Sequence, residues 1–174
     1  MAHYDLGNDF YRLWLDPGMS YSAAIYRATD AGDLETAQRA KYRRILRRLH
    51  AGAGQSVLEI GCGWGGFAEI AVAEGLQVTG LTLSPAQLEW AQKRVPEADL
   101  RLRDYRDISE QFDHIVSIEM FEAVGERWWP NYFQTIARAL KPGGVLRPVD
   151  ILVRLGSASG RAGCEGDDQR PSSS

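Results

Sequence analysis

The sequence predicts an α/β fold, a Rossmann-like, doubly wound and mostly parallel sheet that is incomplete at its C-terminus. Short apolar runs of strand length alternate with segments of helical spacing between residues 56 and 145, which is typical of βαβ units. A glycine cluster follows the first of these runs, at the position where doubly wound sheets bind nucleotides. Crossovers between parallel strands are almost always right-handed, so helices should cover both faces of the sheet.

Composition limits the classes of protein to consider. The 174 residues suffice for one domain with a sizeable core, and 44% apolar and 25% charged residues are normal for a soluble globular protein. No run approaches the roughly 18–20 apolar residues of a membrane span, and the start does not resemble a secretory signal. The net charge of −3 argues against nucleic-acid binding. Cys62 and Cys164 indicate no disulfide framework, which favours a cytoplasmic location.

Residues 1–55 are expected to form an irregular leader and one helix that covers the cofactor site. Asp33 is a plausible N-cap for this helix, which should run to about Leu49 and end at Gly52. Its apolar residues fall near one face, and basic residues occupy the rest. These are Arg39, Lys41, Arg43, Arg44, Arg47 and Arg48. We interpret them as a solvated surface, with docking on anionic lipid headgroups as the alternative.

Residues 56–153 are expected to form the nucleotide-binding core. Strands are predicted at 56–61, 77–83, 100–103 and 112–118, and helices at 67–74, 85–95 and 130–140. A fifth strand at 145–153 is doubtful, because Arg147, Pro148 and Asp150 interrupt it and proline cannot donate to a central ladder. The tail, 154–174, is rich in Gly, Ser and charge and should be disordered. Its loss of pattern is also what an aberrant sequence would show.

The loop from Gly61 to Gly66 favours close approach of a ligand to the backbone, because a Cβ there would collide with it. Its spacing alone does not choose between NAD and S-adenosylmethionine (SAM). Glu59, two residues before the loop, would repel a pyrophosphate but suits an ammonium or sulfonium group. The segment 82–87 lacks the acid that NAD enzymes place after the second strand. SAM is therefore the preferred ligand.

Other reactive side chains have plainer interpretations. The histidines at positions 3, 50 and 114 are scattered and do not have metal-ligand spacing, so structural roles are favoured and no metal site is predicted. Cys62 is interpreted as a small residue packed beneath the loop rather than a nucleophile. Trp128 and Trp129 could either pack the start of a helix or line a lipid pocket.

Five motifs in order resemble the cyclopropane-fatty-acyl-phospholipid synthases, to which the mycolic acid cyclopropane synthases are close relatives. They are HYDLGNDFY (3–11), MSYS (19–22), LEIGCGWGG (58–66), RDYRD (103–107) and MFEAVGE (120–126). The resemblance spans about residues 3–145. It implies the fold of a class I methyltransferase and SAM as cofactor.

The resemblance also implies roles for individual residues. Glu122 matches a carboxylate that helps to hold a bicarbonate ion in the active site. The leader pair matches contacts that reach over the cofactor, and the glycine loop matches contacts around the methionyl part. Residues after the second strand match ribose contacts, and RDYRD matches contacts near the adenine. The implied cofactor residues are Tyr21, Ser22, Glu59, Gly61, Cys62, Gly63, Gly65, Thr82, Leu83, Gln87, Asp104, Tyr105 and Arg106.

The implied activity is transfer of the SAM methyl group to the cis double bond of an unsaturated fatty acyl chain of a phospholipid. Loss of a proton from the new methyl group then closes a cyclopropane ring. The resemblance implies a cytoplasmic enzyme with partners at the inner face of the membrane, and it leaves a homodimer open for the full-length family. An inactive SAM-binding fragment and a small-molecule methyltransferase are the alternatives, because a fold does not fix a substrate.

Two departures from the family pattern concern the bicarbonate site. Ala23 follows the Tyr-Ser pair where well-known bacterial enzymes have a cysteine, and Ala123 stands where they have a histidine. A methylated or otherwise altered fatty chain is therefore an alternative product. The resemblance ends near Gly144 and Val145, before the seven strands of the family sheet are complete. The chain is accordingly expected to be incomplete and inactive, through a frameshift or a natural truncation.

Overall fold

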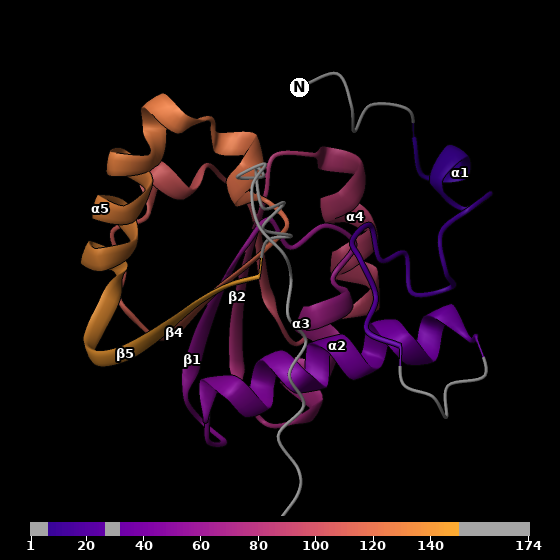
Figure 1. Ribbon diagram of the computed structural model, residues 1–174, viewed down its shortest axis with the longest axis horizontal. Helices are drawn as coiled ribbons and strands as arrows, with labels where there is room; N and C mark the ends of the chain where they lie inside the picture. The colour runs from indigo at the N-terminus through magenta and orange to yellow at the C-terminus, as the bar shows by residue number, and fades with distance from the viewer. Residues whose placement is uncertain (1–6, 27–31, 150–174) are drawn as a thin grey trace, which may run out of the picture.

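A computed structural model describes residues 7–26 and 32–149. In this part of the chain a five-stranded parallel sheet has the order β3-β2-β1-β4-β5 (Figure 1). The strands are β1 Ser56–Ile60, β2 Gln77–Thr82, β3 Asp99–Leu102, β4 Phe112–Ile118 and β5 Leu140–Val149. The α-helices are α1 Asn8–Tyr11, α2 Leu34–Leu49, α3 Gly66–Ala73, α4 Pro85–Arg94 and α5 Trp129–Ala139. Short 3-10 helices are η2 Tyr105–Asp107, η3 Phe121–Val124 and η4 Glu126–Trp128.

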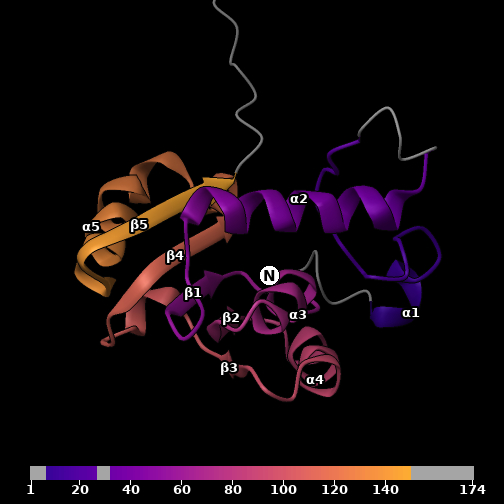
Figure 2. The same ribbon diagram turned by 90° about the horizontal axis from the view of Figure 1, so that it is seen from below.

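Helices pack on both faces of the sheet, as predicted, and divide the core in two (Figures 1 and 2). Successive strand residues point to opposite faces. Val57 and Val116 therefore pack in one cluster with α2, α3 and α4. Leu58 and Ile115 pack in the other with α5. The doubly wound fold predicted from the alternating runs is confirmed.

Helix α2 confirms the predicted cap, and its predicted basic surface is confirmed at Arg43, Arg44, Arg47 and Arg48 but not at Lys41. The Asp33 carboxylate accepts a hydrogen bond from the Thr36 backbone N–H at 3.1 Å, and the helix ends at His50 in a left-handed conformation. Lys41, predicted on the charged outer side, is instead buried. Its position shares a face with Ala37 and Ile45, four residues away in either direction, so helical geometry turns it inward.

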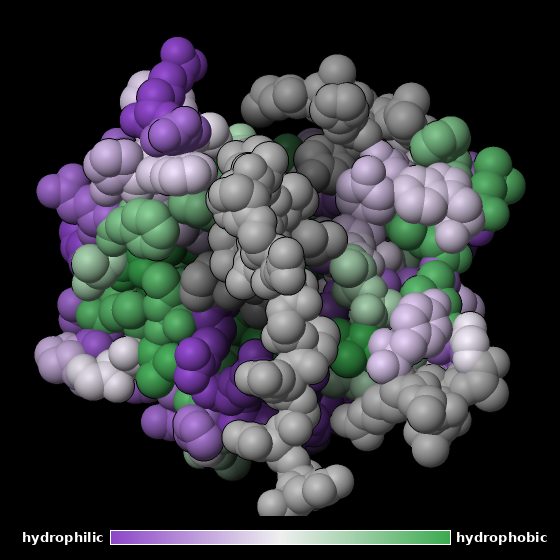
Figure 3. Space-filling model, viewed as in Figure 1, coloured by the Kyte–Doolittle hydropathy of each residue, from purple (hydrophilic) through white to green (hydrophobic). Residues whose placement is uncertain are grey.

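Strand β5 differs from its prediction. It begins at Leu140, directly after α5, and pairs in parallel with β4, with an irregular register between Phe112 and His114. Within the described residues β5 has a strand partner on one side, which is compatible with Pro148. Figure 3 shows apolar side chains gathered over α5 and β5. The predicted continuation to 153 and the tail at 154–174 lie outside the described residues.

A polar clasp joins three strands at the start of β4. Asp113 accepts hydrogen bonds from the backbone N–H and the hydroxyl of Ser56 at 2.8 and 2.7 Å, and the Lys141 ammonium lies 3.0 Å from the same carboxylate. These three contacts connect β1, β4 and β5, and the loops that follow β1 and β4 belong to the site described below. No helix of the described residues is long and apolar enough to cross a bilayer.

Candidate functional site

A cavity of about 690 Å³ opens at the carboxyl ends of β1, β2 and β4. Ligands of open α/β sheets bind at this edge. Leader residues 19–22, the glycine loop and the segments that follow β2, β3 and β4 form its wall. All the predicted cofactor residues except Gly65 line it.

The glycine loop gives the cavity its floor. Gly61 and Gly63 have φ values of 83° and 52°, which other residues rarely adopt. The N–H groups of Gly61 and Cys62 donate to the carbonyl of Leu81 at 2.9 and 2.8 Å and tie the loop to β2. A Cβ at Gly65 would lie 3.2 Å from that of Ala91, so Gly65 permits α3 to pack against α4 rather than lining the cavity.

Cys62 is buried between the loop and β2. A Cβ on Gly80 would approach its Cβ to 3.0 Å, which shows how closely the two backbones pack. Burial, together with the nearby Glu59 carboxylate, raises the pKa of the thiol far above its usual range. A thiol with a raised pKa is a poor nucleophile, which agrees with the packing interpretation.

Glu59 is the residue of the cavity wall that most clearly indicates the charge of a ligand. It is 3% exposed, and its Oε2 has no hydrogen-bond partner among the described residues. Burial raises the pKa of this carboxyl group, and the charges of Lys41 and Arg94 oppose the rise. A buried carboxylate without a partner is costly. A ligand with an ammonium group would supply both the hydrogen bond and the opposite charge, so the site fits the methionyl end of SAM.

Polar, uncharged side chains follow β2. The Thr82 hydroxyl donates to Oε1 of Gln87 at 2.9 Å, and Ser84 caps α4 through the Gln87 backbone N–H at 3.4 Å. These groups can bond ribose hydroxyls and lack the acid typical of NAD sites. Leu83, between them, also lines the cavity.

Asp104, Tyr105 and Arg106 lie together on and before η2. The Asp104 carboxylate accepts hydrogen bonds from the backbone N–H and Nε of Arg106, both at 2.9 Å, and these contacts lower its pKa. The Tyr105 ring meets Tyr132 of α5 edge to face, with centroids 5.3 Å apart. All three residues line the cavity, so an aromatic ring and a charged pair border it on this side.

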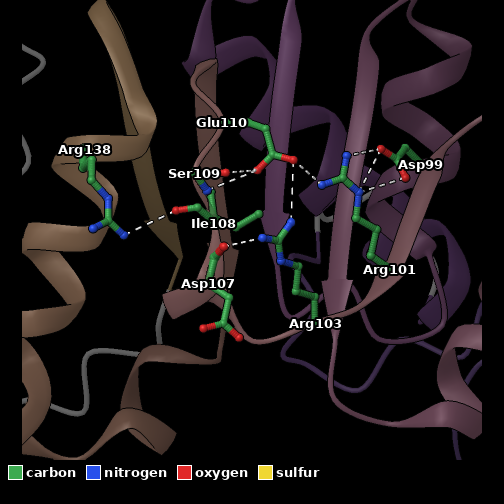
Figure 4. Close-up of polar contacts among 8 residues, drawn as sticks. All are labelled: Asp99, Arg101, Arg103, Asp107, Ile108, Ser109, Glu110 and Arg138. Atoms are coloured by element: carbon green, nitrogen blue, oxygen red, sulfur yellow. Dashed lines mark hydrogen bonds and ion pairs between the residues drawn. The ribbon is translucent and has the colours of Figure 1, made fainter.

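A second network holds this segment in place (Figure 4). The Glu110 carboxylate accepts a hydrogen bond from Arg101 at 2.6 Å and lies 3.6 Å from the guanidinium of Arg103. The contact with Arg101 is the main reason that the pKa of Glu110 falls to about 2. Arg103 also donates to the carbonyl of Asp107, and Arg138 of α5 donates to that of Ile108 at 3.3 Å. The loop around η2 is thereby fixed to β3 and α5.

The leader crosses one side of the cavity. The Tyr21 ring packs on Tyr11 and Trp14, with centroids 5.6 and 5.4 Å away. The Ala23 N–H donates to the Glu119 carboxylate at 2.8 Å. Glu119 directly follows β4 and has a φ of 49°, an uncommon conformation that persists where surrounding contacts hold it. Tyr21 and Ser22, which were predicted to contact the cofactor, line the cavity.

The segment after β4 combines the catalytic candidate with an aromatic cluster. Glu122 belongs to η3, and its side chain lies outside the described part of the structure. Its neighbour Ala123 lines the cavity. Trp128 also lines the cavity, whereas Trp129 stacks on Phe121 with centroids 5.0 Å apart. Trp129 thus packs at the start of α5, and a lipid-lining role for Trp128 stays a prediction.

Several residues of the wall were not predicted from the sequence. They are Met19, Ser20, Tyr42, Glu119, Met120 and Asn131. None belongs to the glycine loop, and they meet only when the leader, α2 and the β4 end are folded together. Of these, Tyr42 could have been found from its place on the apolar face of α2, where burial raises its pKa to about 12. A Cβ at Gly66 would lie 3.0 Å from the Tyr42 hydroxyl.

Comparisons with known proteins agree with the geometry. A model of the family "Mycolic acid cyclopropane synthetase" matches residues 1–158. The cyclopropane-fatty-acyl-phospholipid synthase of Escherichia coli K12 is 46% identical over 146 residues, which are 82% of this chain and 38% of that protein. A probable fatty acid methyltransferase of Pseudomonas putida is 41% identical over 153 residues, covering 83% and 39%.

A comparison with a solved structure agrees with the fold as well. The mycolic acid cyclopropane synthase CmaA1, complexed with SAH and CTAB, superposes with a TM-score of 0.78 and 37% identity. The match covers 83% of this chain and 53% of that one. The chain thus spans about two-fifths of the length of the two curated relatives and about half of the solved structure.

Proposed function

The chain belongs to the mycolic acid cyclopropane synthetase family, and from this premise we propose that it serves SAM-dependent methyl transfer to the cis double bond of an unsaturated phospholipid acyl chain, with closure of a cyclopropane ring. The observation that carries the proposal is Glu59, a buried carboxylate beside the glycine loop with an unpartnered oxygen. A cationic ligand satisfies it, and a pyrophosphate does not. SAM supplies an electrophilic methyl group when it is bound.

The residues of the cavity wall would bind and orient SAM and would shield the reaction from water. The glycine loop and Glu59 would hold the methionyl part, Thr82 and Gln87 the ribose, and Tyr105 the adenine. The aromatic rings of Tyr21 and Trp128 on the cavity wall would exclude water and stabilise positive charge that develops on the acyl chain. Ring closure needs a proton acceptor, and we assign Glu122 to helping hold a bicarbonate base.

A second product, a methyl-branched chain without a ring, is favoured by one observation. Ala123 lines the cavity, and Ala23 contacts Glu119 through its backbone N–H, so neither offers a side-chain hydrogen bond to a bicarbonate ion. If the base is held weakly, the cation can instead lose a proton to water from a chain carbon next to the cationic centre, which gives a methyl-branched alkene. The Pseudomonas putida relative carries the name of a fatty acid methyltransferase, which points the same way.

Calorimetry and product analysis test the proposal. The 174-residue chain is titrated with SAH and, separately, with NAD, and labelled SAM is then supplied with vesicles of unsaturated phospholipid. Binding of SAH and label in the acyl chains support the proposal, and proton NMR of the extracted acyl chains distinguishes the ring from the branch. SAH binding without transfer identifies an inactive SAM-binding fragment. NAD binding without a response to SAH would overturn the assignment.

We also propose a cytoplasmic location at the inner face of the membrane. A groove of about 560 Å³ on the outer side of α2 is lined by Ala40, Arg44, Arg47, Arg48 and His50, together with Ile25 and Tyr26 of the leader and Arg147 of β5. We call this set the basic groove. Clustered arginines beside an aromatic side chain suit anionic headgroups. Changing Arg44, Arg47 and Arg48 of α2 to glutamine should abolish sedimentation with anionic vesicles, and unchanged sedimentation would remove the groove from membrane contact.

A homodimer stays a prediction of the family resemblance. Sedimentation equilibrium of the purified chain measures it directly. A single species of monomer mass across the accessible concentrations would contradict the prediction for this chain.

A further inference from the structure

Lys41 is a buried cation that the cofactor contacts described above do not use. It is 2% exposed, whereas Arg43 and Arg44, which follow closely on α2, are exposed. A lysine is almost never buried to this degree unless its charge is paired and its N–H groups are hydrogen-bonded. The surroundings of its ammonium group therefore show what it does.

The ammonium group of Lys41 holds the leader. Its Nζ donates to the hydroxyl of Ser22 and to Oε1 of Gln38, the latter at 2.6 Å. Nε2 of Gln38 in turn donates to the backbone carbonyl of Ser22 at 2.6 Å. Two side chains of α2 thus bind one leader residue. Lys41 binds the hydroxyl of Ser22, and Gln38 binds its backbone carbonyl. Ser22 itself lines the cavity.

Carboxylates face Lys41 from three other elements. Glu119 after β4, Asp16 of the leader and Glu59 of β1 all favour its charged form. Burial has the larger effect and lowers the pKa of Lys41 to about 8, which still leaves it mostly charged at neutral pH. The Tyr42 ring lies beneath the ammonium at 4.5 Å. The cation therefore sits where leader, sheet and helix meet.

Two of these carboxylates also shape the leader. Asp16 accepts hydrogen bonds from the N–H groups of Gly18 and Ser20, both at 2.9 Å, and Glu119 accepts from Ala23 at 2.8 Å. Lys41 thus binds the leader directly and balances the charge of the groups that bend it. We propose that Lys41 is the positioning residue that fastens leader residues 19–23 across the cavity and so sets the place of Tyr21 and Ser22. The effect on Tyr21 and Ser22 rests on the proposed function, because it takes SAM as the ligand that they contact.

The test uses the full chain with Lys41→Met, which keeps the length of the side chain and removes its charge and donors. Hydrogen exchange of the ligand-free protein is measured by mass spectrometry, and SAH affinity by calorimetry. Exchange of residues 19–23 should rise about tenfold while that of α3 and β4 stays unchanged, because local openings need not involve the core. The Kd for SAH should rise about tenfold. The control Arg43→Met, on the exposed side of the same helix, should change neither.

A second variant, Ser22→Ala, distinguishes a positioning role of Lys41 from a merely structural one. This change lies in the leader and removes the hydroxyl that Lys41 binds. If Lys41 acts through Ser22, exchange of residues 19–23 in the ligand-free double variant should be no faster than in Lys41→Met alone, because coupled residues are not additive. Additive increases in exchange would overturn the proposal. Should Lys41→Met fail to fold, Ser22→Ala must still speed leader exchange, and its failure to do so overturns the proposal as well.

The remaining outcomes separate this inference from the proposed function. Faster exchange throughout the molecule, with no preference for the leader, would make Lys41 a general stabilising residue and refute the positioning role. Unchanged leader exchange would refute it too. Selective loosening of the leader in a chain that does not bind SAH supports the positioning role and refutes the cofactor assignment.

Discussion

At the scale of single residues, the cofactor assignment depends on Glu59. Its unpartnered oxygen is buried beside glycines that leave the loop backbone open to a ligand, and a Cβ at Gly63 would meet no atom within 4 Å. An isolated buried carboxylate destabilises the ligand-free protein. The same group gains a charge-assisted hydrogen bond when an ammonium arrives. Glu59 thus lowers the stability of the ligand-free protein and raises its affinity for a ligand with an ammonium group.

The first prediction follows from that exchange. Glu59→Gln keeps the size of the side chain and removes its charge, so SAH should bind about tenfold or more weakly, given about 1.5–3 kcal/mol for a hydrogen bond to a charged group. The variant should also melt at a higher temperature than the parent without ligand. Calorimetry and thermal unfolding measure the two effects. Equal SAH affinity in both proteins would remove Glu59 from the site.

The second prediction concerns Glu122. In an otherwise complete homologue that carries this sequence, Glu122→Gln should keep the affinity for SAH and lose product formation, because a residue that acts only in the reaction contributes little to binding. Labelled SAM and unsaturated vesicles give the rate, and calorimetry the affinity. Unchanged turnover would exclude Glu122 from the reaction.

At the scale of elements, strands with strong periodicity were predictable and contacts between distant segments were not. The predicted strand at 112–118 matches β4, and that at 77–83 matches β2 within one residue. Local apolar pattern decides both. Lys41 was misplaced because a lysine is normally exposed, and only the fold brings the leader and Glu119 to it. The early start of β5 depends on pairing with β4, which no local pattern reveals.

A third prediction tests the packing of the glycine loop on β2. A Cβ on Gly80 would lie 2.6 Å from Cδ2 of Leu100 and 3.0 Å from Cβ of Cys62. Gly80→Ala should therefore destabilise the protein by about 1–3 kcal/mol, the usual cost of overpacking. Urea unfolding measures the loss. The companion variant Gly52→Ala, where the nearest atom to a new Cβ is a glutamine side-chain oxygen at 3.7 Å, should cost less. Equal costs would contradict this account.

At the scale of the whole molecule, acid should loosen the sheet through the clasp at Asp113. Hydrogen bonds from Ser56 and the nearby Lys141 hold the pKa of this carboxyl group far below its usual range. A group with a lowered folded-state pKa adds stability above its unfolded pKa of about 4 and loses it as the pH falls further. The free energy of unfolding should therefore drop between about pH 5 and pH 2.

Asp113→Asn isolates this contribution from that of other carboxylates, Glu110 among them. The variant should be less stable than the parent at pH 7, by about 1–3 kcal/mol for the charge-assisted hydrogen bonds, and the difference should shrink towards pH 2. Urea unfolding across this pH range measures it. A difference that stays constant with pH would show that the charge of Asp113 does not matter.

The parallel sheet also has a consequence for how the chain acquires its structure. Each strand pairs with a strand from which a long crossover separates it, and central β1 has its two partners at 77–81 and 114–117. No hairpin can start such a sheet, so loop closure must precede each pairing, and folding should be slow for a chain of this size. On the ribosome, β1 and β2 can pair while β4 is still unmade. One side of β1 then stays unpaired until 36 more residues are synthesised, from position 81 to position 117.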